Sequence, residues 1–337
     1  MKLLLDRRKN PFFDHAEAEY FLAERGGTVV GRIAAISNRL HNEFHHENIG
    51  FFGFFESTED PAVAGALLDT AADWVRSRGH TLIRGPASFS TNDECGLLVW
   101  GFDTPPTLMM PHNPPWYGTL IEGAGFSKAK DLNVYEGGSE SGSTPPERVQ
   151  RATDLVCKRL GITLRPLDMK HFDRELGHIK RLYNACWERN WGFVPMTERE
   201  IDHLAAQFKP IVIPDCVPIV EKDGVPIGFG LALTDLNVVF RTNRQGYLLP
   251  VLPRLLWALK RETIRRARVL LLGVIPEWRG KGIDSVLYHW LWAQAGKHGM
   301  PWGEGSWVLE DNAAINLGLT KLGMRHYKTL RMYDRPL

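Results

Sequence analysis

The chain has 337 residues, and its 44% hydrophobic and 24% charged side chains are typical of a globular protein. Because a single hydrophobic core stops growing at roughly 250–300 residues, this length favours two domains. The net charge of +2, without long basic runs, excludes the electrostatic footprint of a nucleic-acid-binding protein. No window approaches the ~18 apolar residues of a membrane span, so we expect neither nucleic acid nor a membrane as partner.

The start of the chain and its cysteines indicate the compartment. Only three consecutive leucines precede Asp6, too few for the apolar region of a signal peptide. The four cysteines are far apart and lack CxxC spacing, which favours reduced thiols in a cytoplasmic protein, with neither metal nor disulfide. They are Cys95, Cys157, Cys186 and Cys216.

A histidine-rich segment, "HNEFHH", covers residues 41–46. His41 and His45 are four residues apart, a spacing that could place both on one face of a helix and bind a metal. No third ligand is evident nearby. A solvated or interfacial histidine cluster is therefore favoured over a metal site.

The first half contains a predicted strand over 49–56, the turn "STEDP", and a helix with apolar residues at i, i+3, i+4 and i+7 that ends at Gly79. Ser57 or Thr58 is the expected cap of that helix. The two carboxylates of the turn would repel a phosphate by on the order of 1–4 kcal/mol each at ~4 Å. We expect this half to pack on the other half or to help close its acceptor site.

After an insertion over 85–112, a helix opened by Asn113 and a strand over 125–135 complete the first half. Gly, Ser and Pro then cluster without apolar residues, which predicts a linker over 138–147. The linker separates predicted domains at 1–137 and 148–337.

The second half repeats the order of the first. It has a strand over 268–275, a loop over 276–282, a helix ending at Gly299, a strand over 302–309, a helix opened by Asn312 and a strand over 323–333. The same succession of strand, turn, helix, strand, helix and strand indicates an internal duplication.

The loop "PEWRGKG" differs from the equivalent turn of the first half. Gly280 and Gly282 let the backbone approach an anion without an intervening Cβ, and the start of a helix offers unpaired N–H groups and positive potential. Arg279 and Lys281 can add charge-assisted hydrogen bonds. The loop predicts a phosphate site; the alternative is a glycine-rich turn that only begins the helix.

The segment "VIPEWRGKGI" resembles the V-x-P-x-x-R-G-x-G-[IL] signature of the GNAT superfamily of N-acetyltransferases. "WVLEDNAAINLGLTKLGMRHYKTLRMY" is similar to the family's later strand, helix and final strand, and the likeness covers 268–333. The whole chain resembles bacterial tandem GNAT-like proteins. The resemblance implies an α/β (α+β) fold of two tandem GNAT-like domains, with mixed, mostly antiparallel sheets flanked by helices. The first domain would be degenerate, lacking the pyrophosphate loop.

The resemblance also implies an acyl-CoA co-substrate, such as acetyl-CoA, and no metal. The segment 280–283 would hold the pyrophosphate through its N–H groups, and the end of the strand before it would bind the pantetheine arm and polarise the thioester. The residues so assigned are Val274, Ile275, Arg279, Gly280, Lys281, Gly282, Ile283 and Asn312, of which Asn312 is also an ordinary helix cap. Two positions depart from the pattern: Asp284 replaces Gly or Ala, and Leu319 replaces a frequent tyrosine.

Catalytic groups are less clear from the sequence. Glu304, with Glu310 behind it, is the candidate base that neutralises the acceptor amine, although a solvated glutamate at a strand end is an equal alternative. Tyr327 or Tyr333 could protonate the leaving thiolate, or could be core aromatics. The aromatic turn after a helix precedes a predicted capping box of Thr197 and Glu200. The turn could wall an acceptor pocket or plug a domain interface. Its candidate substrate-binding residues are Trp187, Asn190, Trp191 and Phe193.

These features predict an acyl-CoA-dependent N-acyltransferase, in the simplest case an acetyltransferase, that moves an acyl group to a small-molecule amine by direct attack. Transfer from an acyl carrier protein is a related possibility, with the "RRAR" of 265–268 meeting its acidic surface. A non-catalytic acyl-thioester-binding or scaffold protein is the alternative from another class. An aminoacyltransferase that uses charged tRNA is disfavoured by the lack of a basic face.

Overall fold

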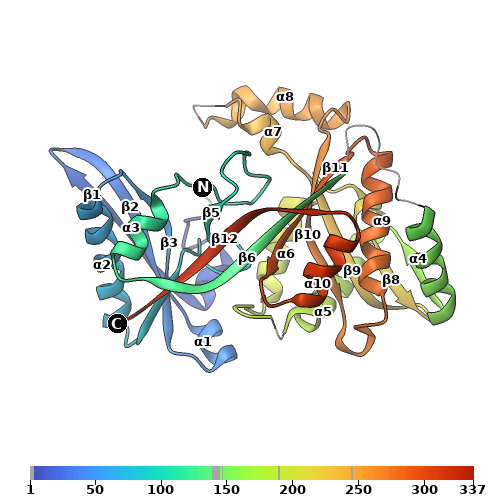
Figure 1. The fold of residues 1–337 in the computed structure, drawn as a ribbon, viewed down its shortest axis with the longest axis horizontal. Coiled ribbons are helices and arrows are strands. Elements are labelled where there is room, and N and C mark those ends of the chain that lie inside the picture. The colour runs from blue at the N-terminus through green and yellow to red at the C-terminus, as the bar shows by residue number, and fades with distance from the viewer. Residues whose placement is uncertain (1–3, 139–144, 146, 189, 244–245) are drawn as a thin grey trace.

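The computed structural model describes residues 4–138, 145, 147–188, 190–243 and 246–337. Most of the predicted linker, residues 139–144 and 146, lies outside the described residues. Figure 1 shows two lobes connected by the long strands β6 and β12, which run side by side through the middle of the molecule. Within the described part of the chain, no helix combines the length and the apolar character needed to cross a bilayer.

One sheet runs through both lobes. Its pairs are antiparallel except for two parallel ones, β3 with β4 and β10 with β11, as predicted for a mixed, mostly antiparallel sheet. The strands in spatial order are β1 (Ala16–Arg25), β2 (Thr28–Asn38), β3 (Ile49–Ser57), β4 (Leu82–Gly85), β12 (Arg325–Pro336), β6 (Ser127–Gly138), β11 (Trp302–Leu309), β10 (Arg266–Val274), β9 (Val225–Thr234), β8 (Ile219–Lys222) and β7 (Ile162–Arg165), while β5 (Leu97–Trp100) pairs with β12.

The two halves exchange their last strands. β6 ends the first half but pairs with β11 of the second, whereas β12 ends the second half and pairs with β4 and β5 of the first. The two exchanged strands also pair with each other. Outward from this central pair, β4, β3, β2 and β1 on one side correspond to β11, β10, β9 and β8 on the other, where β7 is added at the edge. This correspondence is expected for the duplicated units that the sequence predicted. The division into domains near residue 138 stays a prediction.

The helices flank the sheet in both lobes. Figure 1 shows α2 and α3 in one lobe and α4 and α9 in the other, with α7 and α8 at one extremity. The helices are α1 (Arg39–His45), α2 (Pro61–Ser77), α3 (Tyr117–Gly123), α4 (Glu147–Leu160), α5 (Phe172–Trp187), α6 (Glu198–Phe208), α7 (Asn237–Phe240), α8 (Leu248–Lys260), α9 (Ile283–Lys297) and α10 (Ala313–Lys321), with short 3-10 turns η1 (Pro11–Asp14), η2 (Met169–His171), η3 (Pro214–Cys216) and η4 (Pro276–Trp278).

Helix α2 has the apolar stripe and the terminal glycine that the sequence predicts, but its N-cap differs from the expectation. Its apolar stripe is buried against the sheet, and Gly79 follows its end with φ +84°. The expected cap at Ser57 or Thr58 is wrong. Asp60 is the N-cap: its carboxylate accepts from the N–H of Ala62 at 2.8 Å and pairs with Arg25 at 2.8 Å.

Asn113 does not open a helix, contrary to the expectation. Its side-chain amide bonds both backbone groups of Leu98, accepting at 2.7 Å and donating at 3.1 Å, and so fixes β5. Helix α3 begins later, with Trp116 at its N-cap and no side-chain cap. The insertion before it needs anchoring to the sheet, and Asn113 provides that anchor.

Polar contacts hold the lobes together on the side of α6. The predicted capping box of Thr197 and Glu200 is present at the start of α6. The same Glu200 carboxylate lies 3.0 Å from Nε2 of His15, a residue of the first half. Helix α6 is therefore fixed to the other half at its first turn.

Candidate active site

A cavity lies where β10 and β11 separate. Their parallel pairing covers only four positions, from Arg266 opposite Trp302 to Val269 opposite Gly305. An irregularity in the pairing of β10 with β9 between Val269 and Leu271 accompanies this end. Beyond it the strands diverge and border a cavity of about 510 Å³, lined by 269–274 on one side and 305–309 on the other.

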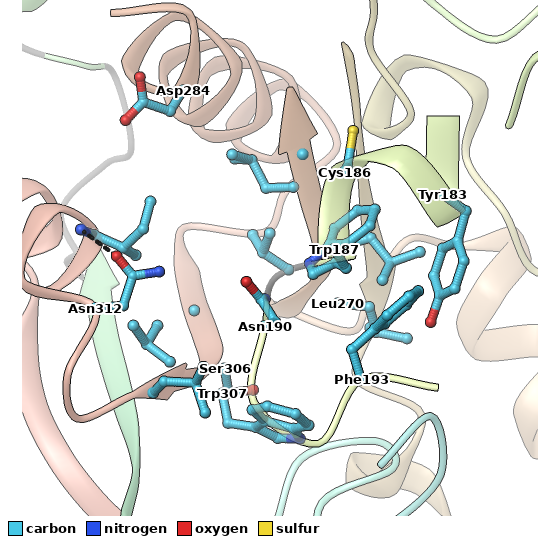
Figure 2. A pocket seen from close by; sticks show the side chains of 18 of the residues that line it. Tyr183, Cys186, Trp187, Asn190, Phe193, Leu270, Asp284, Ser306, Trp307 and Asn312 are labelled. Atoms are coloured by element: carbon cyan, nitrogen blue, oxygen red, sulfur yellow. Dashed lines mark hydrogen bonds between the residues drawn. The ribbon is translucent and has the colours of Figure 1, made fainter. Parts of the chain in front are cut away.

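Helix α5 and the turn after it form the facing wall. Figure 2 shows Tyr183 and Phe193 on one side of the cavity and Asn312 and Asp284 on the other, with Asn190 between them. The predicted acceptor-binding residues all belong to this wall: Trp187, Asn190, Trp191 and Phe193. Gly273 lets the helix approach β10 closely, because a Cβ there would lie 2.7 Å from side-chain atoms of Cys186 and Trp187.

The first half supplies the third wall. Thr91, Asn92 and Asp93, from the insertion, line the cavity. They also bind the aromatic turn: Thr91 Oγ1 donates to the carbonyl of Gly192 at 2.5 Å, and Asn92 Nδ2 donates to that of Val194 at 2.9 Å. The turn is therefore both a cavity wall and a contact between the halves, and its role in binding an acceptor stays a prediction.

The histidine-rich segment belongs to the same contact. His45 Nε2 lies 2.6 Å from the carbonyl oxygen of Phe193, and the ring of Phe44 packs edge-on against that of Phe193. His41 is buried, with Nε2 3.0 Å from a carboxylate oxygen of Glu47. The segment is an interfacial cluster, and the described residues contain no group of three or more potential ligands for a metal.

Asp93 is the titratable group that sequence reasoning missed. It is half-buried in the cavity wall, and its Oδ2 accepts from the hydroxyl of Ser90 at 3.1 Å. Burial raises the pKa of its carboxyl to about 7. A carboxylate with that pKa can exchange a proton with an amine near neutral pH. The only signal in the sequence was the length of the insertion that carries Asp93.

The thiol in the wall has no comparable reactivity. Cys186 is buried, and burial raises the pKa of its thiol to about 12, so it stays protonated at neutral pH. Direct attack on a thioester by the acceptor therefore fits this cavity better than a thiolate nucleophile.

The glycine loop has the predicted backbone. Gly280 and Gly282 have φ +70° and +87°, which side chains with a Cβ rarely adopt. Gly282 is the N-cap of α9 and supplies no side-chain cap, so the first N–H groups of the helix lack that partner. Of the predicted co-substrate residues, four line the cavity, while Ile275, Lys281, Gly282 and Ile283 lie outside its wall. The four are Val274, Arg279, Gly280 and Asn312.

Arg279 is placed differently from the predicted phosphate contact. Its guanidinium donates to the carbonyls of Cys186 at 2.9 Å, Ala185 at 3.3 Å and Val274 at 3.2 Å. It therefore ties the end of α5 to the end of β10, because the last carbonyls of a helix need donors. Lys281 is exposed, with its ammonium 4.4 Å from the ring centre of Trp278.

The two departures from the family pattern also have defined places. Asp284 lines the cavity, in the first turn of α9. Leu319 is fully buried and packs with Tyr135 and Val308, so it has no access to a leaving thiolate. Tyr288, one turn after Asp284, does line the cavity, and burial raises the pKa of its phenol, which stays protonated. Asn312 caps α10, accepting from the N–H of Ile315 at 3.3 Å.

Glu304 and Tyr327, the predicted catalytic pair, are buried behind the cavity wall. Glu304 is not a solvated strand-end residue: its exposed fraction is 0%. Its carboxylate accepts from Tyr327, from Ser306 at 2.5 Å and from Thr107 at 2.7 Å, and lies 3.7 Å from Arg268 Nε. Neither residue of the predicted pair lines the cavity. The arrangement is that of a buried polar network supporting β11, with Thr107 supplied by the first half.

Comparison with known proteins agrees with this architecture. No family model matches the chain. It is 39% identical over 339 residues to the bacterial ceramide synthase of Caulobacter vibrioides (strain NA1000 / CB15N), covering 99% of this chain and 87% of the relative. It is 35% identical over 334 residues to protein YghO of Escherichia coli (strain K12), covering 98% and 85%.

Solved structures of low identity share the fold. A GCN5-related N-acetyltransferase from Sphaerobacter thermophilus superposes with a TM-score of 0.55 at 13% identity, over 94% of this chain and 80% of that one. A tandem GNAT protein from the clavulanic acid biosynthesis pathway gives 0.54 at 12% identity, over 96% and 83%. The chain therefore has the fold of the tandem GNAT proteins and belongs to the family that contains the bacterial ceramide synthase of C. vibrioides and protein YghO of E. coli.

Proposed function

We propose that the chain is an acyltransferase that moves a fatty acyl group from a thioester to the amino group of a long-chain amine. The C. vibrioides relative is a ceramide synthase, and a ceramide is the amide of a fatty acid with a long-chain amino alcohol. The observation that carries the proposal is the cavity shared by the two halves, in which apolar walls lie beside Asp93, a carboxyl that can accept a proton near neutral pH.

The character of the walls favours long aliphatic groups over an acetyl group. Most of the lining side chains are aliphatic or aromatic, as in cavities that bind apolar ligands. The aromatic turn, β10 and β11 supply most of them, with Leu204 and Phe208 from α6 and Met109 from the first half among the others.

The thioester would bind along the separated strands. Beyond Val269 the edge of β10 that faces β11 has no strand partner within the described residues. The Val274 carbonyl accepts from Arg279, and the other backbone groups of this edge can bond an extended acyl-bearing arm. The start of α9, with Gly280 in the cavity wall, supplies N–H groups for a diphosphate. Coenzyme A has both an extended acyl-bearing arm and a diphosphate. The phosphorylated arm of an acyl carrier protein has the extended arm without the diphosphate.

Asp93 is the proposed base. Once its carboxyl is ionised, it takes a proton from the acceptor ammonium, and the neutral nitrogen attacks the thioester carbonyl carbon. The carbon–sulfur bond then breaks, the nitrogen loses its second proton to give the amide, and the departing thiolate, whose conjugate acid has a pKa near 8–9, takes up a proton in exchange. Tyr288, a protonated hydroxyl in the same wall, is the candidate donor.

Thiol release tests this function. Palmitoyl-CoA and a long-chain amino alcohol should give free thiol and an amide of matching mass, whereas acetyl-CoA should give much slower release. Palmitoyl acyl carrier protein as the only active donor would identify the protein thioester as the substrate. Thioester binding without turnover on any amine would instead support the scaffold function, which the engaged guanidinium of Arg279 and the carboxylate of Asp284 favour.

Asp284→Asn is expected to tighten the binding of coenzyme A. The carboxylate lies in the first turn of α9, where it opposes a diphosphate by about 1 kcal/mol in a partly solvated setting, or about fivefold in affinity. Calorimetric titration measures this, and added salt should shrink the difference. Asp73→Asn, at an exposed position of α2, is the matched control. Equal or weaker affinity of Asp284→Asn would place the diphosphate elsewhere.

A further inference from the structure

Helix α8 exposes an apolar face at one extremity of the molecule. Leu249 is 83% exposed, and Leu256 and Trp257 are 59% and 60% exposed. Leu252 lies on the same side of the helix by its spacing, and Tyr247 precedes the first turn. We call these five residues the α8 surface. Figure 1 shows α8, together with α7, projecting from the end of its lobe.

The opposite face of α8 already has its packing partners. Leu255 and Ala258 are buried in a cluster with Leu236 and Ile264, and Val251 is buried on the same side. A helix that is apolar on both faces is normally enclosed by protein or lipid. The α8 surface is contiguous, so it indicates a second partner.

The charge around α8 identifies the partner. The sequence from 237 to 265 has six basic residues and one acidic residue, Glu262. The described basic residues of this segment are exposed. A second copy of the chain packed symmetrically on this surface would bring like charges together. Exposed leucines with tryptophan, tyrosine and flanking cations are instead the pattern of a helix that lies in the interface of an anionic bilayer. The basic residues are Arg241, Arg244, Arg254, Lys260, Arg261 and Arg265.

We propose that the α8 surface docks the protein on an anionic lipid bilayer. The leucines and Trp257 enter the headgroup region, and the flanking cations contact lipid phosphates. The sequence led us to expect no membrane partner because it contains no spanning segment; a helix that lies flat on a bilayer needs none. The inference goes beyond the proposed reaction, since it concerns a surface outside the cavity.

The docking surface is connected to the cavity through shared packing. The cluster beneath α8 includes Leu108 and Ile211. Leu108 is followed by Met109, and Ile211 donates its N–H to the carbonyl of Phe208 at 2.9 Å. Met109 and Phe208 both line the cavity. A bilayer against α8 would therefore be separated from these lining residues only by the cluster beneath the helix.

Co-sedimentation with vesicles tests the proposal on the full chain, without thioester or amine. The protein should pellet with vesicles of phosphatidylglycerol and phosphatidylcholine, pellet less with phosphatidylcholine alone, and be released in part by salt. Leu256→Ser combined with Trp257→Ser should lower the partition onto anionic vesicles by about tenfold or more. Lys260→Glu combined with Arg261→Glu should weaken binding to anionic vesicles only.

The matched control is Leu22→Ser combined with Val29→Ser. These residues are 63% and 53% exposed on β1 and β2, far along the chain from α8, and their loss should leave the partition unchanged. An unaltered pellet for the Leu256 and Trp257 variant, or a wild-type protein that stays in the supernatant, would overturn the proposal. So would a wild-type dimer that this variant converts to a monomer. Acyl transfer assayed with dispersed substrates, without vesicles, reports on the proposed reaction separately.

Discussion

Asp93→Asn is expected to lower kcat/KM for acyl transfer by roughly 10²–10⁴-fold, the usual contribution of a positioned base. In the wild-type protein, kcat/KM should rise with pH and level off above about 7, because the raised pKa of Asp93 keeps its carboxyl protonated below that value. The variant should lose this limb of the profile. Thiol release between pH 5 and pH 9 measures both effects.

Stability measurements separate this role from a structural one. A carboxyl whose pKa is raised by folding disfavours the native state increasingly as pH rises from its ordinary value to about 7. Asp93→Asn should therefore unfold at an equal or higher urea concentration than the wild type at pH 8. Asp103→Asn, an exposed position in the same insertion, should change neither property. Full activity of Asp93→Asn would remove it from the mechanism.

Glu304→Ala is expected to destabilise the fold by about 3–5 kcal/mol, because it leaves Arg268 buried without its carboxylate. Arg268 is 5% exposed, and burial lowers the pKa of its guanidinium. The hydroxyls of Thr107, Ser306 and Tyr327 would lose an acceptor in the same change. Urea unfolding followed by circular dichroism measures the loss.

Glu310→Ala is the control for that prediction. Glu310 makes a surface ion pair with Lys128 at 2.7 Å, and such pairs contribute about 0–1 kcal/mol. Glu304→Gln, which keeps the shape and part of the hydrogen bonding, should lie between the two. If Glu304→Ala kept wild-type stability but lost activity, the carboxylate would act in the reaction after all, through a rearranged wall.

Local patterns in the sequence predicted the elements that depend on nearby residues. The strand, loop and helix from 268 to 299 have the expected order, and Gly280 and Gly282 have the left-handed backbone that their loop needs. The capping box at Thr197 is also present. In each case the determining residues lie within one turn or one loop, so spacing alone carries the information.

The remaining features depend on residues that meet only in the folded chain. The contacts of Arg279 could not be predicted because its acceptors, at the end of α5, lie some ninety residues earlier. Asp93 lines the cavity because the insertion of the first half reaches the second half. The spacing of apolar residues in the sequence does not indicate that contact. From the sequence, Glu304 could be an ordinary glutamate at a strand end. In the fold it is buried beside Thr107 and Arg268, which lie far from it in the chain.

The exchange of β6 and β12 predicts that neither half folds as a separate module. Expressed alone, either half would leave the edge of its parallel pair without the strand that covers it, and exposed edges promote aggregation. Partners such as Arg84 and Asp334 lie 250 residues apart, so the centre of the sheet can close only after nearly the whole chain has been synthesised. Once duplicated, such a gene would have to be inherited as one unit. One copy could lose its ligand loop and still be retained as the other copy's scaffold.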